Sequence, residues 1–198
     1  DIMLSKDLPL LDLVKNKLDI KFDKYSIALF HPPFFKDKKT FFKEALIFVK
    51  SLILSRKNYL VIYPNNDFGN DVIINIYNKL LKKNKNFRII KSFRFEFFLT
   101  LLKNSDFIIG NSSAGIREAP IYGINTINIG NRQKNRFNYA SINNINFNSK
   151  KILQSIKKIN KKKYKLSKHF GKGNSADLIF KILNNEKFWK ISKQKQMI

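Results

Sequence analysis

The chain has 198 residues, 43% of them hydrophobic and 14% aromatic, and its 39 Lys and Arg outweigh 14 Asp and Glu to give a formal net charge of +25. This length and apolar content fit one globular domain with a sizeable core, so they exclude two full catalytic domains and disorder over the bulk. Cysteine is absent. Its absence excludes disulfides, thiolate metal sites and cysteine nucleophiles, and it favours a reducing compartment such as the cytoplasm.

The most apolar stretches, residues 45–54 and 95–102, are shorter than the roughly 20 residues that a membrane helix needs. The N-terminus lacks the basic region followed by an apolar run that is typical of a signal peptide. We therefore expect no membrane span and a cytoplasmic protein.

The basic charge has two interpretations. Clustered Lys and Arg neutralise phosphates, so a nucleic-acid partner is one of them. The other is a solvated surface, because Lys, Asn, Ile and Phe are the residues favoured by A+T-rich codons. The densest cluster runs from Lys150 to Lys165, on one amphipathic helix and the linker after it. We expect a solvated basic face there and consider nucleic acid the weaker alternative.

From Tyr25 onward, short β-rich runs alternate with helical ones. Residues 25–30 are predicted to form a buried strand that ends at His31, because two prolines follow and proline cannot donate to a sheet. Residues 40–55 are predicted to form a helix, since their apolar positions recur at spacings of three and four. The same alternation predicts strands at 59–63, 87–90, 106–109 and 126–130, and helices at 71–83, 95–102, 116–122, 149–159 and 176–184.

Crossovers between successive strands are almost always right-handed, which makes the strands parallel and places helices on both faces. The predicted fold class is therefore α/β, a doubly wound, mostly parallel, Rossmann-like sheet. We divide the chain into a helix and lead-in at residues 1–24, a Rossmann-like core at 25–148 and basic C-terminal helices at 149–198.

In an open parallel sheet, ligands bind in the crevice beyond the carboxyl ends of the strands. The residues that follow the predicted strands are unusually polar: His31, Asn65 to Asp67, Ser92 and Phe93, Asn111 to Ser113, and Asn131 to Gln133.

The loop before the helix at residues 116–122 suggests a phosphate site. A helix that begins near Gly115 presents unpaired backbone N–H groups and a positive dipole end, so with Ser112 and Ser113 it could cradle a phosphate. The alternative is an ordinary N-cap, which Ser and Asn provide at most helix starts.

Glu118 follows in the same helix, where a carboxylate suits a sugar better than a phosphate. A carboxylate can accept both hydroxyls of a ribose, so the group favours a nucleotide, although a capping box with a serine is the alternative. Arg132 could balance a diphosphate or be solvated. His31 could act in the site or be a hydrogen-bonded residue at a strand end. Too few ligands surround His31 to predict a metal.

Six segments, in order along the chain, resemble the hydrolysing UDP-N-acetylglucosamine 2-epimerases, and more narrowly the bacterial branch in sialic or legionaminic acid biosynthesis. The segments are LSKDLP (4–9), HP (31–32), YPNNDFG (63–69), RFEFFLTLLKNSDFIIGNSSAGIREAP (94–120), YGINTINIGNRQ (122–133) and FGKGNSA (170–176).

This resemblance implies a protein similar to GT-B glycosyltransferases, with two Rossmann-like domains and the nucleotide sugar bound between them. The chain looks like the C-terminal half, without the N-terminal domain. By resemblance, the UDP-binding residues are His31, Ser112 and Ser113 at the diphosphate, Glu118 at the ribose, Ser92 and Phe93 at the uracil, and Asn65 and Arg132 at further nucleotide contacts.

The family's reaction eliminates UDP across C1 and C2 to leave a 2-acetamidoglucal, and water then adds to give N-acetylmannosamine or a related sugar. The resemblance implies neither a metal nor another cofactor. The acid and base carboxylates lie mainly in the N-terminal half, so His31 is the catalytic candidate here. The implied partners are a UDP-sugar, a separately encoded N-terminal domain and a second copy of the chain.

One matched segment departs from the family pattern. After HP the family usually has Val-Thr-Thr and an acidic residue, whereas this chain has Pro33-Phe34-Phe35-Lys36, with Asp37 one place later. Two other functions stay open at this point: a basic nucleic-acid-binding domain, and one half of a GT-B glycosyltransferase.

Overall fold

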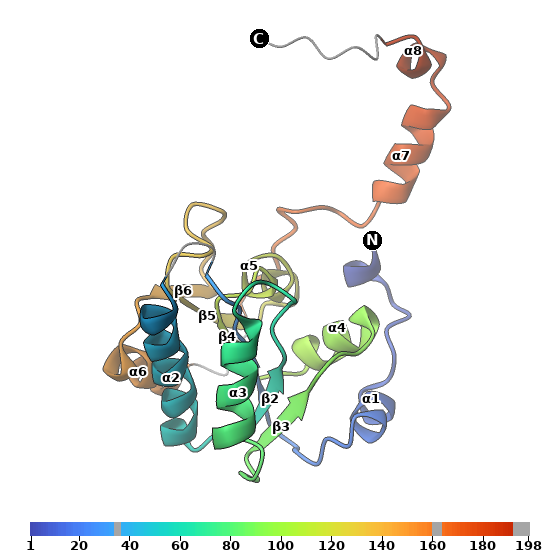
Figure 1. Ribbon diagram of the computed structural model, residues 1–198. Coiled ribbons are helices and arrows are strands. Elements are labelled where there is room, and N and C mark those ends of the chain that lie inside the picture. Colours follow the sequence, from blue (N-terminus) through green and yellow to red (C-terminus); the bar gives the residue numbers. More distant parts are fainter. Residues whose placement is uncertain (34–36, 160–163, 192–198) are drawn as a thin grey trace.

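The structure, a computed structural model, describes residues 1–33, 37–159 and 164–191. Within these ranges, six strands form one sheet in the order β3-β2-β1-β4-β5-β6, and all five pairings are parallel (Figure 1). The strands are β1 (Ser26–Leu29), β2 (Tyr59–Ile62), β3 (Phe87–Ile90), β4 (Phe107–Gly110), β5 (Asn125–Ile129) and β6 (Ile142–Ile145).

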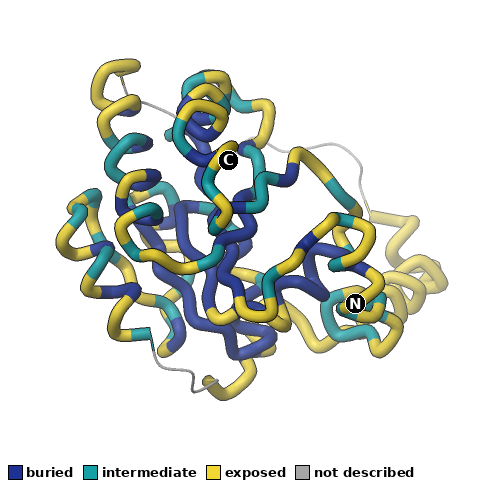
Figure 2. Tube along the Cα trace, turned by 90° about the horizontal axis from the view of Figure 1, so that it is seen from below, coloured by how far each residue is buried: buried dark blue, intermediate teal, exposed yellow. Residues whose placement is uncertain are grey.

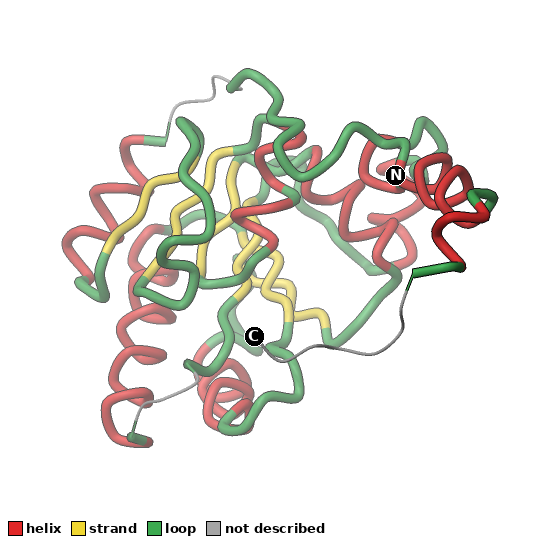
Figure 3. The backbone as a smooth tube through the Cα atoms, turned by 90° about the horizontal axis from the view of Figure 1, so that it is seen from above, coloured by secondary structure: helices red, strands yellow, loops and turns green. Residues whose placement is uncertain are grey.

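Helices cover both faces of this sheet (Figure 3). Side chains alternate along the strands: Ala28 and Phe30 join one core cluster, whereas Ile27 and Leu29 join the other. The first cluster packs under α2 (Lys38–Ser55), α3 (Asn70–Leu80) and α6 (Ser149–Lys158). The second packs under α1 (Leu11–Lys17), α4 (Phe95–Lys103), α5 (Ala114–Arg117) and the 3-10 turn η2 (Ala119–Tyr122). The doubly wound α/β prediction is confirmed.

Five of the six strands lie where the sequence predicts them, within about a residue. The sixth, β6, was not predicted. Its middle residues, Asn143 and Asn144, are exposed, and asparagine is depleted in strands, so this edge strand shows neither alternation nor an apolar run. The predicted helix at 116–122 divides into α5 and η2, with Pro120 in the first turn of η2.

The C-terminal segment differs from the rest of the molecule. Helices α7 (Ser175–Leu183) and α8 (Glu186–Trp189) stand away from the sheet and bury no residue (Figure 1). The buried residues concentrate instead around the sheet (Figure 2). The carboxylate of Asp1 accepts hydrogen bonds from the backbone N–H groups of Ser175 and Ala176, both at 2.8 Å. Over the ranges that the structure describes, no helix is both long enough and apolar enough to cross a membrane.

Candidate functional site

Successive strands are added to one side of β1 as far as β3 and to its other side from β4 onward, so the strand order reverses between β1 and β4. Open α/β sheets bind ligands at such a switch point. A cavity of about 660 Å³ lies at the carboxyl ends of the strands there. It brings together all eight residues that the sequence predicts for the site: His31, Asn65, Ser92, Phe93, Ser112, Ser113, Glu118 and Arg132.

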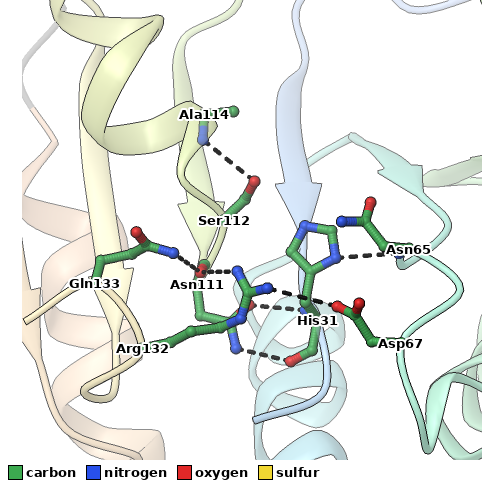
Figure 4. Close-up of polar contacts among 8 residues, drawn as sticks. All are labelled: His31, Asn65, Asp67, Asn111, Ser112, Ala114, Arg132 and Gln133. Carbon is green, nitrogen blue, oxygen red and sulfur yellow. Dashed lines mark hydrogen bonds and ion pairs between the residues drawn. The ribbon is translucent and has the colours of Figure 1, made fainter. Parts of the chain in front are cut away.

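His31 follows β1 and is 4% exposed. Its Nδ1 accepts a hydrogen bond from the backbone N–H of Asn65 at 3.2 Å, so a neutral ring carries its proton on Nε2 (Figure 4). Burial, with a smaller effect from the charge of Arg132, lowers the pKa of His31 to about 4 against the opposing effect of Asp67. At neutral pH His31 is therefore a neutral hydrogen-bond donor.

Asn111, at the end of β4, holds the backbone of His31 with its side chain. Its Oδ1 accepts from the backbone N–H of His31 at 2.7 Å, and its Nδ2 donates to the carbonyl of His31 at 2.8 Å. The Asn111 carbonyl in turn accepts from Gln133 Nε2 at 2.9 Å and from Arg132 Nη1 at 3.5 Å (Figure 4). One buried asparagine thus joins the ends of β1, β4 and β5.

Arg132 lies in the loop after β5, with its side chain 12% exposed. Its Nη2 lies 3.5 Å from Oδ2 of Asp67, in the loop after β2. Burial lowers the pKa of the guanidinium while Asp67 raises it, and an arginine stays charged in any case. A fixed positive charge therefore faces the cavity beside the neutral donor of His31.

The loop before α5 differs from the predicted phosphate cradle. The N–H of Gly115 donates to the Ser112 carbonyl at 3.2 Å, so it is not unpaired as expected. An added Cβ at Gly115 would lie 2.6 Å from Cγ2 of Thr126, so glycine is needed for packing against β5. Ser112 Oγ accepts from the N–H of Ala114 at 3.2 Å, which is a capping contact. Ser112 and Ser113 line the cavity, and their hydroxyls are available to an anion there.

Glu118 lies at the junction of α5 and η2. The expected alternative, a capping box, is absent: neither Ser113 nor Glu118 makes a side-chain cap hydrogen bond. Oε2 of Glu118 is buried, and within the described ranges it has no hydrogen-bond partner. Burial raises the pKa of the Glu118 carboxyl, with its own backbone N–H and Arg117 opposing the shift. A buried acceptor without a donor is suited to a ligand hydroxyl.

Several lining residues were missed by the sequence prediction. Tyr63, Phe95 and Phe98 add aromatic surface beside Phe93, and Lys91 and Arg136 add positive charge. Lys91 directly follows β3, so its position was a usable signal. Tyr63 directly follows β2, but it was predicted to lie within the strand. Phe95 and Phe98 come from α4 and Arg136 from a longer loop, where the position of a strand end gives no indication.

The FGKGNSA segment does not line the cavity but packs beside it. The ring of Phe170 lies 5.0 Å from that of Phe137, and Arg117 lies over it at 5.5 Å. Phe137 belongs to the loop that carries Arg132 and Arg136, so the segment supports this loop.

The departure from the family pattern at Phe34, Phe35 and Lys36 falls outside the described residues. So do Lys161 to Lys163 of the basic cluster. In the ranges that the structure does describe, no group of three or more His, Cys, Asp and Glu could hold a metal ion.

Comparison with known proteins agrees with this geometry. Residues 2–184 match the family described as UDP-N-acetylglucosamine 2-epimerase. The chain belongs to this family.

Two curated relatives show the extent of the match. A UDP-N-acetylglucosamine 2-epimerase of Neisseria meningitidis is 37% identical over 203 residues, which cover 100% of this chain and 53% of that protein. A hydrolysing UDP-N,N'-diacetylbacillosamine 2-epimerase of Legionella pneumophila is 28% identical over 68% of this chain and 36% of its own length. The chain therefore spans about half the length, or less, of these epimerases.

A solved structure shows the same fold. The UDP-GlcNAc 2-epimerase of Methanocaldococcus jannaschii, in complex with UDP-GlcNAc and UDP, superposes with a TM-score of 0.63 at 20% identity. The superposition covers 87% of this chain and 48% of that one. This epimerase fold supports the prediction of a GT-B-type half.

Proposed function

We propose that this chain is the nucleotide-binding half of a hydrolysing UDP-N-acetylglucosamine 2-epimerase. The observation that carries the proposal is the cavity at the switch point, which gathers a neutral donor, a held guanidinium and an unpartnered carboxylate from segments far apart in the sequence. These three groups match the parts of a UDP-sugar: two phosphates that need donors and a ribose that needs an acceptor.

The diphosphate would lie at the end of β1 and the loop before α5. Nε2–H of His31, the guanidinium of Arg132 and the hydroxyls of Ser112 and Ser113 would donate to its oxygens, and Asn65 would contribute as a neighbour of His31. These donors are in place before the leaving group develops charge, so they would stabilise UDP as its bond to C1 of the sugar breaks.

His31 would assist this step as a hydrogen-bond donor. A group with a pKa of about 4 is almost entirely deprotonated at neutral pH, so the ring of the free protein has no second proton to give. Its catalytic contribution would be electrostatic, and the proton transfers at C2 would come from carboxylates outside this chain.

The nucleoside would extend towards α4 and α5. Oε2 of Glu118 would accept the ribose hydroxyls, which would supply the donors that it lacks. Ser92 and Phe93, with Phe95 and Phe98 beside them, would hold the uracil by stacking and by polar contacts at its edge. The sugar released would be N-acetylmannosamine or a related 2-epimerised N-acetylhexosamine.

A second domain is the partner that this reaction needs, because the chain spans only about half of its curated relatives. The C-terminal segment supports such a partner, since it exposes large apolar side chains that a soluble surface rarely groups together. They are Leu178, Ile179, Phe180, Ile182, Leu183, Phe188, Trp189 and Ile191. We propose that an N-terminal epimerase domain covers them; a second copy of this chain is the alternative that gel filtration of the purified chain would reveal.

Calorimetric titration of the purified chain with UDP at physiological salt tests the proposal. We expect saturable binding that is selective over ADP and is lost in Glu118→Ala. Equal, weak and steeply salt-dependent binding of both nucleotides would refute it and would favour nonspecific attraction of polyanions to the basic surface.

A further inference from the structure

Asp67 contacts the guanidinium of Arg132 without lining the cavity that Arg132 lines. Its Oδ2 lies 3.5 Å from Arg132 Nη2, and the two side chains are 33% and 12% exposed. Arg132 and His31 line the large cavity, whereas Asp67 lines a separate cavity of about 110 Å³ together with Pro32 and Phe41. A ligand in the large cavity would therefore meet Arg132 but not Asp67, whose contact with Arg132 is drawn in Figure 4.

The ion pair joins loops that follow strands on opposite sides of the switch point. Asp67 follows β2 and Arg132 follows β5, and the central strands β1 and β4 lie between these two in the sheet. The pair thus spans the ends of both central strands. The pair links the two loops directly at the edge of the sheet where the diphosphate would bind.

Arginine is a long side chain that loses much rotamer freedom when it is fixed in one orientation. Among the described residues, Asp67 contacts Nη2 of Arg132 and the carbonyl of Asn111 contacts Nη1, both at 3.5 Å. The carbonyl contact is at the limit of a hydrogen bond, and the contact with Asp67 is an ion pair between two opposite charges that are largely shielded from water.

We propose that Asp67 is a positioning residue that holds the guanidinium of Arg132 in the orientation needed to bind the diphosphate. This inference rests on the proposed function, because the orientation of Arg132 matters only if a diphosphate binds there. Asp67 acts through Arg132 and does not touch the nucleotide. A preorganised guanidinium binds an anion more tightly, because its ordering has been completed during folding.

The direction in which Asp67→Asn changes UDP binding distinguishes a positioning role from a simple electrostatic effect. Asp67→Asn removes a negative charge near an anion site, which by Coulomb's law alone would strengthen UDP binding. If Asp67 positions Arg132, the same substitution releases the guanidinium and weakens UDP binding. We expect the weakening, by about tenfold, which corresponds to the middle of the coupling range for residues in one ion-pair network.

Calorimetry with UDP on four forms of the chain tests the inference: the unaltered chain, Asp67→Asn, Arg132→Ala and the double variant. We expect Asp67→Asn to weaken binding only when Arg132 is present, and Asp67→Glu to restore part of the loss. Asp71→Asn is the matched control, because it removes an equal charge from the exposed first turn of α3 and should leave UDP binding unchanged.

The possible failures are distinct. Asp67→Asn binding UDP as tightly as the unaltered chain, while Arg132→Ala loses binding, would overturn the inference and leave the proposed function intact. An equal loss from Asp67→Asn in the presence and absence of Arg132 would also overturn it, since Asp67 would then act through the fold. Unchanged UDP binding in Arg132→Ala would instead contradict the proposed function at the diphosphate.

Discussion

The two sides of the cavity differ in how far their polar groups are satisfied. On the β1 side, both backbone groups of His31 and its Nδ1 are hydrogen-bonded. Oδ2 of Asp67 is buried there without a hydrogen bond, but it forms an ion pair with Arg132. On the α5 side, Oε2 of Glu118 is buried and has no hydrogen-bond partner among the described residues. The buried carboxylate on the β1 side thus has a positive partner in Arg132, whereas no ion pair within the described residues involves Glu118.

The two sides therefore contribute differently to the free energy of folding. A satisfied buried network rigidifies the ends of the central strands, whereas an unpartnered buried carboxylate costs free energy until a donor reaches it. Substitutions on either side of the cavity test this contrast, and their expected effects on stability decrease from Asn111 to Glu118.

Asn111→Ala should have the largest effect on stability, about 3 kcal/mol of unfolding free energy, because it leaves the buried backbone N–H and carbonyl of His31 without partners. Urea unfolding followed by circular dichroism measures it. Ser112→Ala is the control, since Ser112 Oγ accepts only one capping hydrogen bond, from Ala114, and its loss should cost about 1 kcal/mol. Similar losses from both variants would show that Asn111 is not the centre of the network.

The low pKa of His31 predicts a loss of stability in mild acid. Its pKa is about 4 in the folded protein and about 6.5 in the unfolded chain, so between these pH values the unfolded chain binds more protons. Stability should therefore fall as the pH drops from 6.5 towards 4, by at most about 3 kcal/mol from this residue. His31→Gln should flatten this part of the curve.

The second histidine supplies the control for this titration. His169 is exposed, and its ring stacks on Phe137 at 4.4 Å, away from the cavity. His169→Gln should keep the acid dependence of the unaltered chain. If the stability of both variants depended on pH in the same way, burial of His31 would not be the cause of the loss of stability in acid.

Gly115→Ala tests whether the loop before α5 is limited by packing. The new Cβ would lie 2.6 Å from Cγ2 of Thr126, and overpacking of this kind costs about 2 kcal/mol. Thr126→Ser removes that methyl group and retains the hydroxyl that donates to the Gly115 carbonyl at 2.7 Å. The double variant should regain most of the thermal stability and should bind UDP. Lost UDP binding in a stable double variant would mean that the ligand itself needs Gly115.

The sequence predicted the buried strands of the sheet better than its edge. The strand β1 is buried on both faces and has an apolar run closed by two prolines, so its signal is local and strong. The strand β6 lies at the edge, and its pairing with β5 is decided by the rest of the sheet. No local pattern in Ile142–Ile145 could have shown it.

For the site, position relative to strand ends found His31, Ser112 and Arg132, because parallel strands bring their carboxyl ends to one edge. The same rule pointed to Asn111 and Asp67 without indicating their roles. Those roles depend on which loops meet in space. The prediction of unpaired N–H groups near Gly115 was wrong for a related reason. In the turn before α5, backbone carbonyls accept hydrogen bonds from these N–H groups.

Glu118→Gln should have the smallest effect on stability and the opposite sign. A neutral amide is less costly to bury than a carboxylate, so the variant should gain about 1 kcal/mol of unfolding free energy at pH 7. Because burial raises the pKa of Glu118, the gain should shrink as the pH falls and the carboxyl of the unaltered chain becomes protonated. Thermal unfolding at pH 7 and pH 4.5 measures both effects.

Glu96→Gln is the matched control for this last substitution. Glu96 is in the first turn of α4, and contacts with its own backbone N–H and with Arg94 lower its pKa, so its neutralisation should bring no gain at either pH. A gain confined to Glu118→Gln, together with loss of UDP binding, would show that the fold keeps a destabilising carboxylate for its ligand. No gain would mean that the unaltered protein already satisfies Oε2, and the contrast between the two sides of the cavity would then disappear.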